Sequence, residues 1–318
     1  MSERISRHET VDVGDVVLHA LVRGAANGPV VLLIQQGPGV PMLQDADALE
    51  EYLGLEATHR VVYWDQRGTG RSLAKDATLS VSAMVDDVLA VAKAMSERLH
   101  VQSVDVVGFS LGGTLAMLAA KKDVSCIRSV SAVGPDIQME EAEAFAWRFA
   151  RDEALRRGKR GLAENITKTR DSKAISEGDR LMARVRYVSD LGGIAIGRGF
   201  FGLLLMNLLR ILRSPLYTLA QGLRALQAMQ RTSAALLERE DFAHLDIRDM
   251  TELRVPATIF QGRLDAAAPP FLAEQFHAAL RAPKKALVWF DECAHMPYME
   301  APEAFRAALH TALNHGAP

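Results

Sequence analysis

The sequence is poor in several features that mark specialised classes of protein. Only two cysteines, Cys126 and Cys293, occur in 318 residues, which excludes a disulfide-rich scaffold. Aromatic residues make up 6% of the chain, and the formal net charge is only −2. Because no excess of positive charge is present, we expect no nucleic-acid partner. Hydrophobic residues make up 49% and charged residues 24%, as in globular proteins, so a disordered or collagen-like chain is excluded.

Segments that would direct the chain to a membrane are also scarce. The N-terminal residues carry charges with no apolar segment behind them, so we expect no secretory signal and a cytoplasmic location. The most apolar stretch runs from Gly192 to Leu212 and is about long enough to cross a bilayer. Arg198 within it and the four glycines of its first half favour a buried or pocket-lining pair of helices over a membrane span.

Strand-like and helix-like segments alternate over the first part of the chain. A β-rich stretch at 11–23, with Gly14-Asp15 as its turn, predicts a hairpin. Continuous apolar runs typical of strands buried on both faces lie at 30–34, 60–64, 103–107 and 126–133. Helical patterns between them cover 43–57, 81–99 and 112–122. This alternation predicts an α/β fold with a parallel sheet.

The alternation is interrupted once. From about residue 136 to 241 the patterns are helix-like, and strands return at 257–260 and 286–290, with helices at 271–280 and 301–314. We therefore predict an α/β core from residues 1–135 and 242–318, and a helical cap from 136–241. The cap is expected over the carboxyl ends of the strands, where parallel sheets bind ligands.

A short glycine-flanked motif supplies the candidate nucleophile. Gly108-Phe-Ser-Leu-Gly112 follows a predicted strand and precedes a helix, which is the context in which G-x-S-x-G indicates catalysis. A serine nucleophile stands on a sharp turn, where a side chain at Gly108 or Gly112 would clash with nearby backbone. The helix that begins near Leu111 directs its first N–H groups at a developing oxyanion. Ser110 is therefore the predicted nucleophile.

The candidate base and acid follow later strands. A serine hydroxyl needs a base, and the base needs an orienting carboxylate, in the chain order serine, acid, histidine. Asp265 and His295 each come shortly after a predicted strand, so both are expected at the sheet edge that holds Ser110. The other eight histidines lie near the ends of the chain or outside loops that follow strands. Asp291 and Glu292 are rival acids, but they are too near His295 in sequence to reach it easily.

The loop after the first parallel strand is the candidate oxyanion hole. Gln35-Gln-Gly-Pro-Gly39 follows the strand at 30–34, and its glycines let backbone approach a substrate. We expect the N–H of Gly37 to act together with that of Leu111, with the N–H of Gln36 as second choice.

These motifs together resemble those of the proline iminopeptidase family of α/β-hydrolases. Trp64-Asp-Gln-Arg-Gly-Thr-Gly-Arg-Ser72 is similar to the family's D-Q-R-G-x-G-x-S signature, and the loop from Gln35 to Gly39 is similar to its H-G-G-P-G. The segments around Asp265 and His295 resemble its acid and histidine segments. In our reading of the signature, Asp65 and Arg67 can form a buried ion pair that braces the loops of the site.

The resemblance implies an α/β-hydrolase fold and hydrolysis through an acyl-enzyme. It implies that Ser110 attacks the substrate, that His295 transfers the proton and that Asp265 orients His295. Gly37 and Leu111 would stabilise the oxyanion. It implies neither a metal nor an organic cofactor, and a small molecule or short peptide as substrate; the oligomeric state stays open.

The chain departs from the family in the region that would recognise the substrate. Peptidases of this family hold the substrate's ammonium group with carboxylates of the cap, but Leu181 to Leu237 contains one acid, Asp190, against seven arginines. Glu140, Glu141 and Glu143 are the alternative source of negative charge. Release of an N-terminal residue by a prolyl aminopeptidase is the activity expected first. A carboxylesterase or lactonase for apolar acyl groups is the alternative, and a non-catalytic ligand-binding protein is the third.

Overall fold

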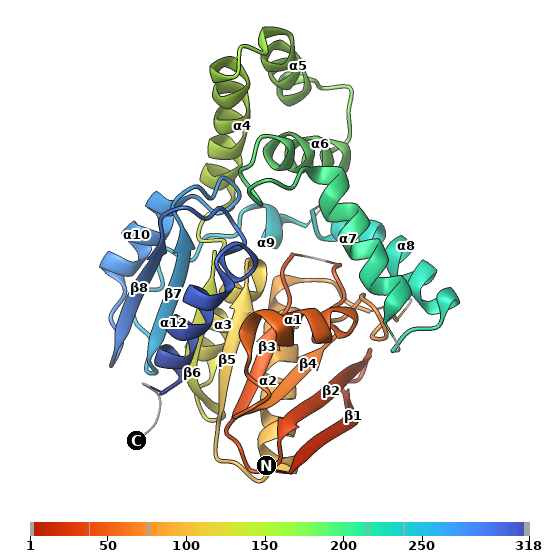
Figure 1. The fold of residues 1–318 in the computed structure, drawn as a ribbon, viewed down its shortest axis with the longest axis vertical. Helices are drawn as coiled ribbons and strands as arrows, with labels where there is room; N and C mark the ends of the chain where they lie inside the picture. The colour runs from red at the N-terminus through yellow and green to blue at the C-terminus, as the bar shows by residue number, and fades with distance from the viewer. Residues whose placement is uncertain (1–2, 38, 75–76, 215, 238, 315–318) are drawn as a thin grey trace.

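The core of the protein is an eight-stranded, mostly parallel sheet (Figure 1). The computed structural model describes residues 3–37, 39–74, 77–214, 216–237 and 239–314. The strands lie in the order β1-β2-β4-β3-β5-β6-β7-β8, and only β1 and β2 are antiparallel to their neighbours. Their bounds are β1 Arg4–Asp12, β2 Val17–Ala25, β3 Val30–Ile34, β4 Arg60–Trp64, β5 Val104–Phe109, β6 Ile127–Val133, β7 Ala257–Gly262 and β8 Lys285–Phe290.

The central strands are buried on both faces, as their continuous apolar runs predict. Alternate residues of β3 point to opposite faces, and each face contributes to its own apolar core. One face packs against α2 Val81–Arg98, α3 Leu111–Lys122 and α10 Pro270–Ala279. The other face packs against α1 Ala46–Leu53 and α12 Pro302–Asn314. The short helices η1 Leu43–Asp45 and α11 Pro297–Glu300 lie close to α1 and α12. The predicted α/β fold class is confirmed.

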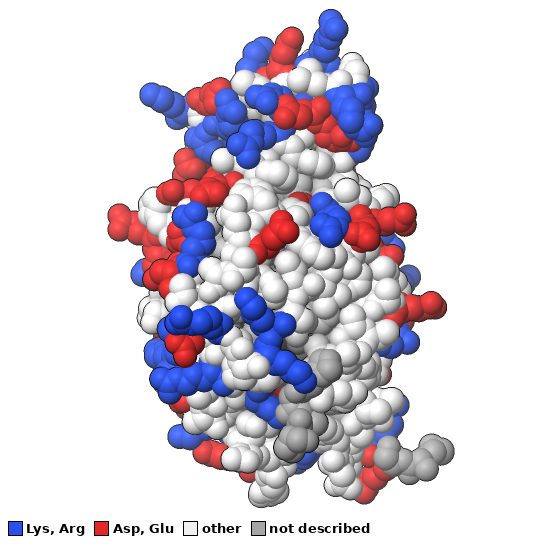
Figure 2. Space-filling model, turned by 90° about the vertical axis from the view of Figure 1, so that its left-hand side faces the viewer, with Lys and Arg blue, Asp and Glu red and all other residues white. Residues whose placement is uncertain are grey.

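A helical region is inserted between β6 and β7, beyond the carboxyl ends of the strands (Figure 1). Its described residues form six helices and no strand. Their bounds are α4 Met139–Arg156, α5 Arg160–Asp171, α6 Glu177–Asp190, α7 Phe200–Arg213, α8 Leu219–Leu237 and α9 Glu240–Ala243. On the side of the molecule shown in Figure 2, charged side chains of both signs cover α4 and α5.

The apolar stretch from Gly192 to Leu212 does not form the expected pair of helices, although Ile194 and Leu205 within it line cavities, as the pocket-lining alternative predicts. Its first part is irregular up to Gly199, and its second part is the single helix α7, of which only Ile211 is buried. In the described part of the chain, we find no helix with the length and hydropathy that a membrane crossing requires.

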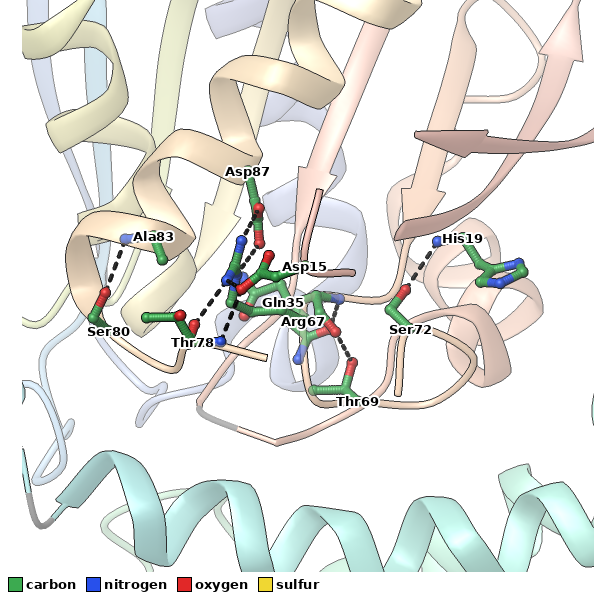
Figure 3. A network of polar contacts seen from close by, with 11 residues as sticks. Asp15, His19, Gln35, Arg67, Thr69, Ser72, Thr78, Ser80, Ala83 and Asp87 are labelled. Atoms are coloured by element: carbon green, nitrogen blue, oxygen red, sulfur yellow. Dashed lines mark hydrogen bonds and ion pairs between the residues drawn. The ribbon is translucent and has the colours of Figure 1, made fainter. Parts of the chain in front are cut away.

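The D-Q-R-G segment braces the loops at the sheet edge, but the predicted ion pair between Asp65 and Arg67 is wrong. Arg67 instead donates from Nε and Nη2 to the two oxygens of Asp87 on α2, over 2.6 and 2.7 Å (Figure 3). It also donates to Asp15 in the turn between β1 and β2 over 3.1 Å. Burial raises the pKa of Asp87, and the contact with Arg67 opposes that shift. A guanidinium that reaches two carboxylates from neighbouring elements ties the hairpin and α2 to the loop after β4.

Asp65 is satisfied mainly by backbone donors. Its Oδ1 accepts from the N–H groups of Met42 and Leu43 over 2.8 and 3.0 Å. Its Oδ2 accepts from the N–H of Arg71 and from the hydroxyl of Tyr217, over 2.8 and 2.6 Å. The chain turns after β4, so Asp65 and Arg67 point to different neighbours. Asp65 therefore joins the loop after β3 to the inserted region.

The pair of Arg67 and Asp87 is expected to carry much of the stability of this region. Arg67→Met leaves the Asp87 carboxylate buried without its partner, so the free energy of unfolding should fall by about 3–5 kcal/mol. Urea unfolding measures this change. Arg67→Met/Asp87→Leu removes both charges and should recover most of the loss. A double variant as unstable as the single one would contradict this role.

Candidate active site

Ser110 occupies the turn between β5 and α3 in a backbone conformation that residues other than glycine seldom adopt. Its φ is 52° and its ψ is −124°, and its N–H donates to the carbonyl of Val133 over 2.7 Å. A Cβ at Gly108 would lie 2.1 Å from the carbonyl oxygen of Gly112, and one at Gly112 would lie 2.4 Å from that of Gln35. Both glycines are therefore required by close backbone approach, as the motif predicts, and the strained turn is held from several sides.

His295 and Asp265 meet at the same edge of the sheet. Nδ1 of His295 lies 2.8 Å from Oδ2 of Asp265, and both side chains are buried. The Asp265 carboxylate also accepts hydrogen bonds from the N–H groups of Ala267 and Ala268, each over 2.8 Å. Burial by itself lowers the pKa of His295, but the charge and hydrogen bond of Asp265 outweigh it, so that the pKa is raised. Asp265 is thus fixed in place and stabilises the protonated imidazole.

The rival acid Asp291 lies elsewhere. Its carboxylate is exposed and accepts from Nε of Arg263 over 2.6 Å. Glu300 has a different role that the sequence analysis missed. It accepts from the N–H of Ala294 over 2.8 Å and from the N–H of Ile196 over 2.6 Å. The loop that carries His295 is therefore tied to the inserted region by a carboxylate of α11.

The sequence analysis also missed Asp136, whose carboxylate approaches Ser110. Oδ2 of Asp136 accepts a long hydrogen bond, 3.5 Å, from the hydroxyl of Ser110. Burial raises the pKa of Asp136 to about 6, although His295 lowers it and Asp265 adds to the rise. Asp136 follows β6, which lies between β5 and β7. The argument that selected Asp265 and His295, a polar side chain shortly after a buried strand, could therefore have found it.

The loop expected to form the oxyanion hole lies against the turn of Ser110. Gly37 has a φ of 61°, and Leu111 is the first residue of α3. The side chain of Gln36 accepts from the hydroxyl of Tyr298 over 3.1 Å. Gln35 lies against the position where Gly112 would carry a Cβ, so the loop after β3 contacts the turn directly. Pro38, the remaining residue of this motif, lies outside the described residues.

A small cavity of about 110 Å³ is lined by Asp136 and by α4 and α6. Most of its wall is apolar, and Glu143 and Arg184 supply the other charges. Nη1 of Arg184 lies 3.4 Å from Oε1 of Glu143. Burial lowers the pKa of Arg184, against the effect of Glu143 and Asp136. With all three side chains ionised, the cavity carries one uncompensated negative charge.

The three glutamates at the start of α4 are distributed unequally. Glu140 lies 2.7 Å from Nδ1 of His244, and Glu141 accepts from Nη1 of Arg248 over 2.6 Å, both at the surface. Only Glu143 lines the cavity. Within the described ranges, no group of three or more His, Cys, Asp or Glu side chains is arranged to hold a metal ion.

Comparison with known proteins shows the family to which the chain belongs. The model of the α/β hydrolase fold family matches residues 29–302, so the chain belongs to this family. It is 20% identical to the probable aminopeptidase YbaC of Bacillus subtilis (strain 168), over 96% of this chain and 95% of that protein. The expected resemblance to proline iminopeptidase-like α/β-hydrolases is thereby confirmed.

Two solved structures share the fold over nearly their whole length. The proline iminopeptidase-related protein TTHA1809 of Thermus thermophilus is 24% identical, with a TM-score of 0.64 and 98% of each chain covered. The esterase RhEst1 of Rhodococcus sp. ECU1013 is 18% identical, with a TM-score of 0.65 and 96% of this chain and 97% of that chain covered. At these identities the likeness concerns the fold.

Asp265 is expected to be essential for turnover, and Asp291 is expected to be dispensable. Asp265→Asn should fold normally and lose about 10⁴-fold in kcat, because the imidazole is then held in the wrong tautomer. Hydrolysis of p-nitrophenyl butyrate measures kcat, and circular dichroism checks folding. Asp291→Asn is the matched control and should keep normal kcat. Normal turnover by Asp265→Asn would remove Asp265 from the acid role.

Proposed function

We propose that the protein is a serine hydrolase that forms an acyl-enzyme, with Ser110 as nucleophile, His295 as base and Asp265 as the orienting acid. In this proposal residues 136–241 act as a cap above the carboxyl ends of the strands. The placement of the three residues after β5, β7 and β8, together with the hydrogen bond between His295 and Asp265, supports it. The protein is expected to act in the cytoplasm.

The chemistry begins with removal of a proton from Ser110. A serine hydroxyl is a weak nucleophile, so His295 takes its proton as the oxygen attacks the substrate carbonyl. The imidazolium that forms is stabilised by the buried Asp265 carboxylate. The N–H groups of Gly37 and Leu111 receive the negative charge on the carbonyl oxygen, with that of Gln36 as the other candidate. His295 then protonates the leaving group. In the second half of the reaction, water gives a proton to His295 and attacks the acyl-enzyme, and Ser110 leaves and takes the proton from His295.

The substrate class proposed first is a short peptide or amide with a free N-terminal amine, as for a prolyl aminopeptidase. The observation that carries this assignment is the Asp136 carboxylate beside the Ser110 hydroxyl, in a cavity that Glu143 also lines. A carboxylate in an apolar recess is costly unless a positive charge compensates it. An ammonium group on the substrate supplies that charge next to the scissile bond, and the small apolar cavity accommodates a compact side chain.

The second candidate is a carboxylesterase or lactonase for small apolar acyl groups. It is favoured by the apolar wall of the cavity, which Ile194, Val185 and Val188 help to form, and by Arg184, which already compensates one of the two carboxylates. Ester and amide hydrolysis use the same nucleophile and base, so the two candidates differ in substrate recognition alone.

Paired substrates separate the candidates. We expect turnover of proline β-naphthylamide, which has a free amine, and weak turnover of its N-acetylated form. Asp136→Asn should raise KM for the free amine by about ten-fold or more, because a charged hydrogen bond is lost, and should change KM for p-nitrophenyl butyrate little. Glu140→Gln, on the outer side of the same helix, is the matched control. Turnover of the ester alone would reject the aminopeptidase assignment.

The pH dependence provides a further measurement on the same substrates. The pKa of Asp136 is raised to about 6, so its carboxylate is charged above that pH and neutral below it. Recognition of an ammonium group should therefore weaken as the pH falls through about 6, seen as a rise in KM for the amine relative to the ester. Titration of His295 changes the hydrolysis of both substrates equally, so it cancels in the ratio of KM for the amine to KM for the ester. The ratio should be flat for Asp136→Asn.

Labelling by a fluorophosphonate tests the serine hydrolase itself. Wild-type protein should be labelled at Ser110, and Ser110→Ala should be unlabelled and lose nearly all turnover while it stays folded. If the wild-type protein remains unlabelled and turns over neither substrate, the serine hydrolase proposal is rejected. The remaining alternative is then a non-catalytic ligand-binding protein.

A further inference from the structure

Helix α7 turns a wholly apolar face outward. Five large side chains on it are exposed, from 37% for Leu209 to 69% for Phe201. The exposed residues are Phe201, Leu204, Leu205, Leu209 and Leu212. Their spacing of three and four residues places them on one side of the helix. We call this set the α7 face. Ile196, in the loop before the helix, is also exposed.

The inner side of α7 holds Arg210, one of the two arginines of the helix. Nη1 of Arg210 lies 3.4 Å from the Asp45 carboxylate, and Nη2 donates to the hydroxyl of Tyr52 over 3.1 Å. Both Arg210 and Asp45 are largely shielded from solvent, and Ile211 is buried beside them. A helix on the surface of a water-soluble protein shows the opposite arrangement, with leucines inside and charges outside. These inner contacts fix the rotation of α7, so the α7 face is turned away from Asp45, and its edge borders the groove beside α1.

The rim of the α7 face is positive. Residues 191–237 contain five arginines and no acid. Arg198 precedes the helix, Arg213 ends it, and both are exposed. The guanidinium of Arg186 lies 6.0 Å from the ring centre of Phe201. Asp190, which lies close, accepts from the N–H of Phe200 over 2.9 Å and lies 3.8 Å from Nε of Arg186. By contrast, α4 and α5 carry paired charges of both signs (Figure 2).

The groove between α7 and α1 offsets only part of this positive charge, through the carboxylates of Asp47 and Glu51. It has a volume of about 550 Å³ and is lined by Leu205, Leu209, Arg198 and Arg213 from the α7 side. From the α1 side it is lined by Asp47 and Glu51. Nη1 of Arg23 lies 2.5 Å from the Asp47 carboxylate, and the same guanidinium also pairs with Glu56. The α7 face therefore combines exposed leucines with guanidinium groups at both ends.

We propose that the α7 face docks onto the surface of a membrane that contains anionic phospholipid. Phe201, Leu205 and Leu212 would enter the boundary between head groups and acyl chains, and Arg198 and Arg213 would bind phosphate groups. With 14 residues, α7 is too short to cross a bilayer and would lie in the plane of its surface. This inference is independent of the proposed function, because it does not involve Ser110 or its neighbours.

A second copy of the chain fits the α7 face less well. In a symmetric dimer, two α7 helices that pair antiparallel bring Arg213 of one copy toward Arg198 of the other. Parallel helices bring Arg213 toward its own equivalent. Both arrangements place like charges together at an apolar contact, which is costly. A lipid surface with phosphate groups at its rim satisfies the same arginines.

Sedimentation of the full-length protein with vesicles tests this proposal. Binding is expected to vesicles of phosphatidylcholine that also contain phosphatidylglycerol, and to be much weaker with phosphatidylcholine alone. Leu205→Glu/Leu212→Glu should lower the partition coefficient by about ten-fold or more for each leucine. Arg198→Gln and Arg213→Gln should each lower it by about five-fold with the anionic vesicles only. Circular dichroism checks that each variant is folded.

Two controls separate lipid docking from other causes. Leu155→Glu changes a similarly exposed leucine on α4 and should bind vesicles as the wild type does. Ser110→Ala should also bind normally, so loss of hydrolysis and loss of docking are distinguishable. The proposal is overturned if neither vesicle binds, or if Leu155→Glu and Leu205→Glu/Leu212→Glu lose binding equally. It is also overturned if light scattering shows a dimer that Leu205→Glu/Leu212→Glu dissolves while no vesicle is bound.

Discussion

The site depends on the close approach of backbone around Ser110. The strand β5 ends in a turn whose φ of 52° is unfavourable for serine, and it is kept there because Gly108 and Gly112 let β3, β5 and α3 come together. A Cβ at either glycine would lie within 2.4 Å of a carbonyl oxygen. The turn places Ser110 at the carboxyl end of β5, and Asp265 and His295 follow β7 and β8 at the same edge of the sheet. Strain of this kind persists only where surrounding structure imposes it.

Buried carboxylates hold the loops around this turn in place, each in a different way. Asp65 accepts hydrogen bonds from backbone N–H groups and from a tyrosine hydroxyl, so it connects the loop after β3 to the inserted helices. Asp265 uses one oxygen for backbone and the other for His295. Asp136 has the long contact with Ser110, and Arg184 and Glu143 line the same cavity. The first two carboxylates are satisfied within the protein. The charge near Asp136 is incompletely compensated, which is why we assign it to substrate recognition.

The inserted region combines two kinds of surface. On α4 and α5 the charges pair with one another in solvent, where each pair contributes little to stability. On α7, Arg210 points inward to its carboxylate partner Asp45, and the leucines point outward. The proposed catalytic role of Ser110 and the proposed docking role of α7 use different residues.

The sequence determined much of this protein, and the tertiary structure decided the rest. Strands buried on both faces leave continuous apolar runs, so β3 and β4 were predictable to the residue, and loops that follow such strands must share one edge. Because Asp265 and His295 lie in loops that follow such strands, the sequence also predicts that they lie close together. It does not give the partner of Arg67, because Asp87 and Asp15 come within reach only when α2 and the hairpin pack on the sheet. The outward direction of the leucines of α7 was also beyond the sequence. A helical pattern shows which residues share a side, and only the contacts of Arg210 with distant residues decide which side faces the protein.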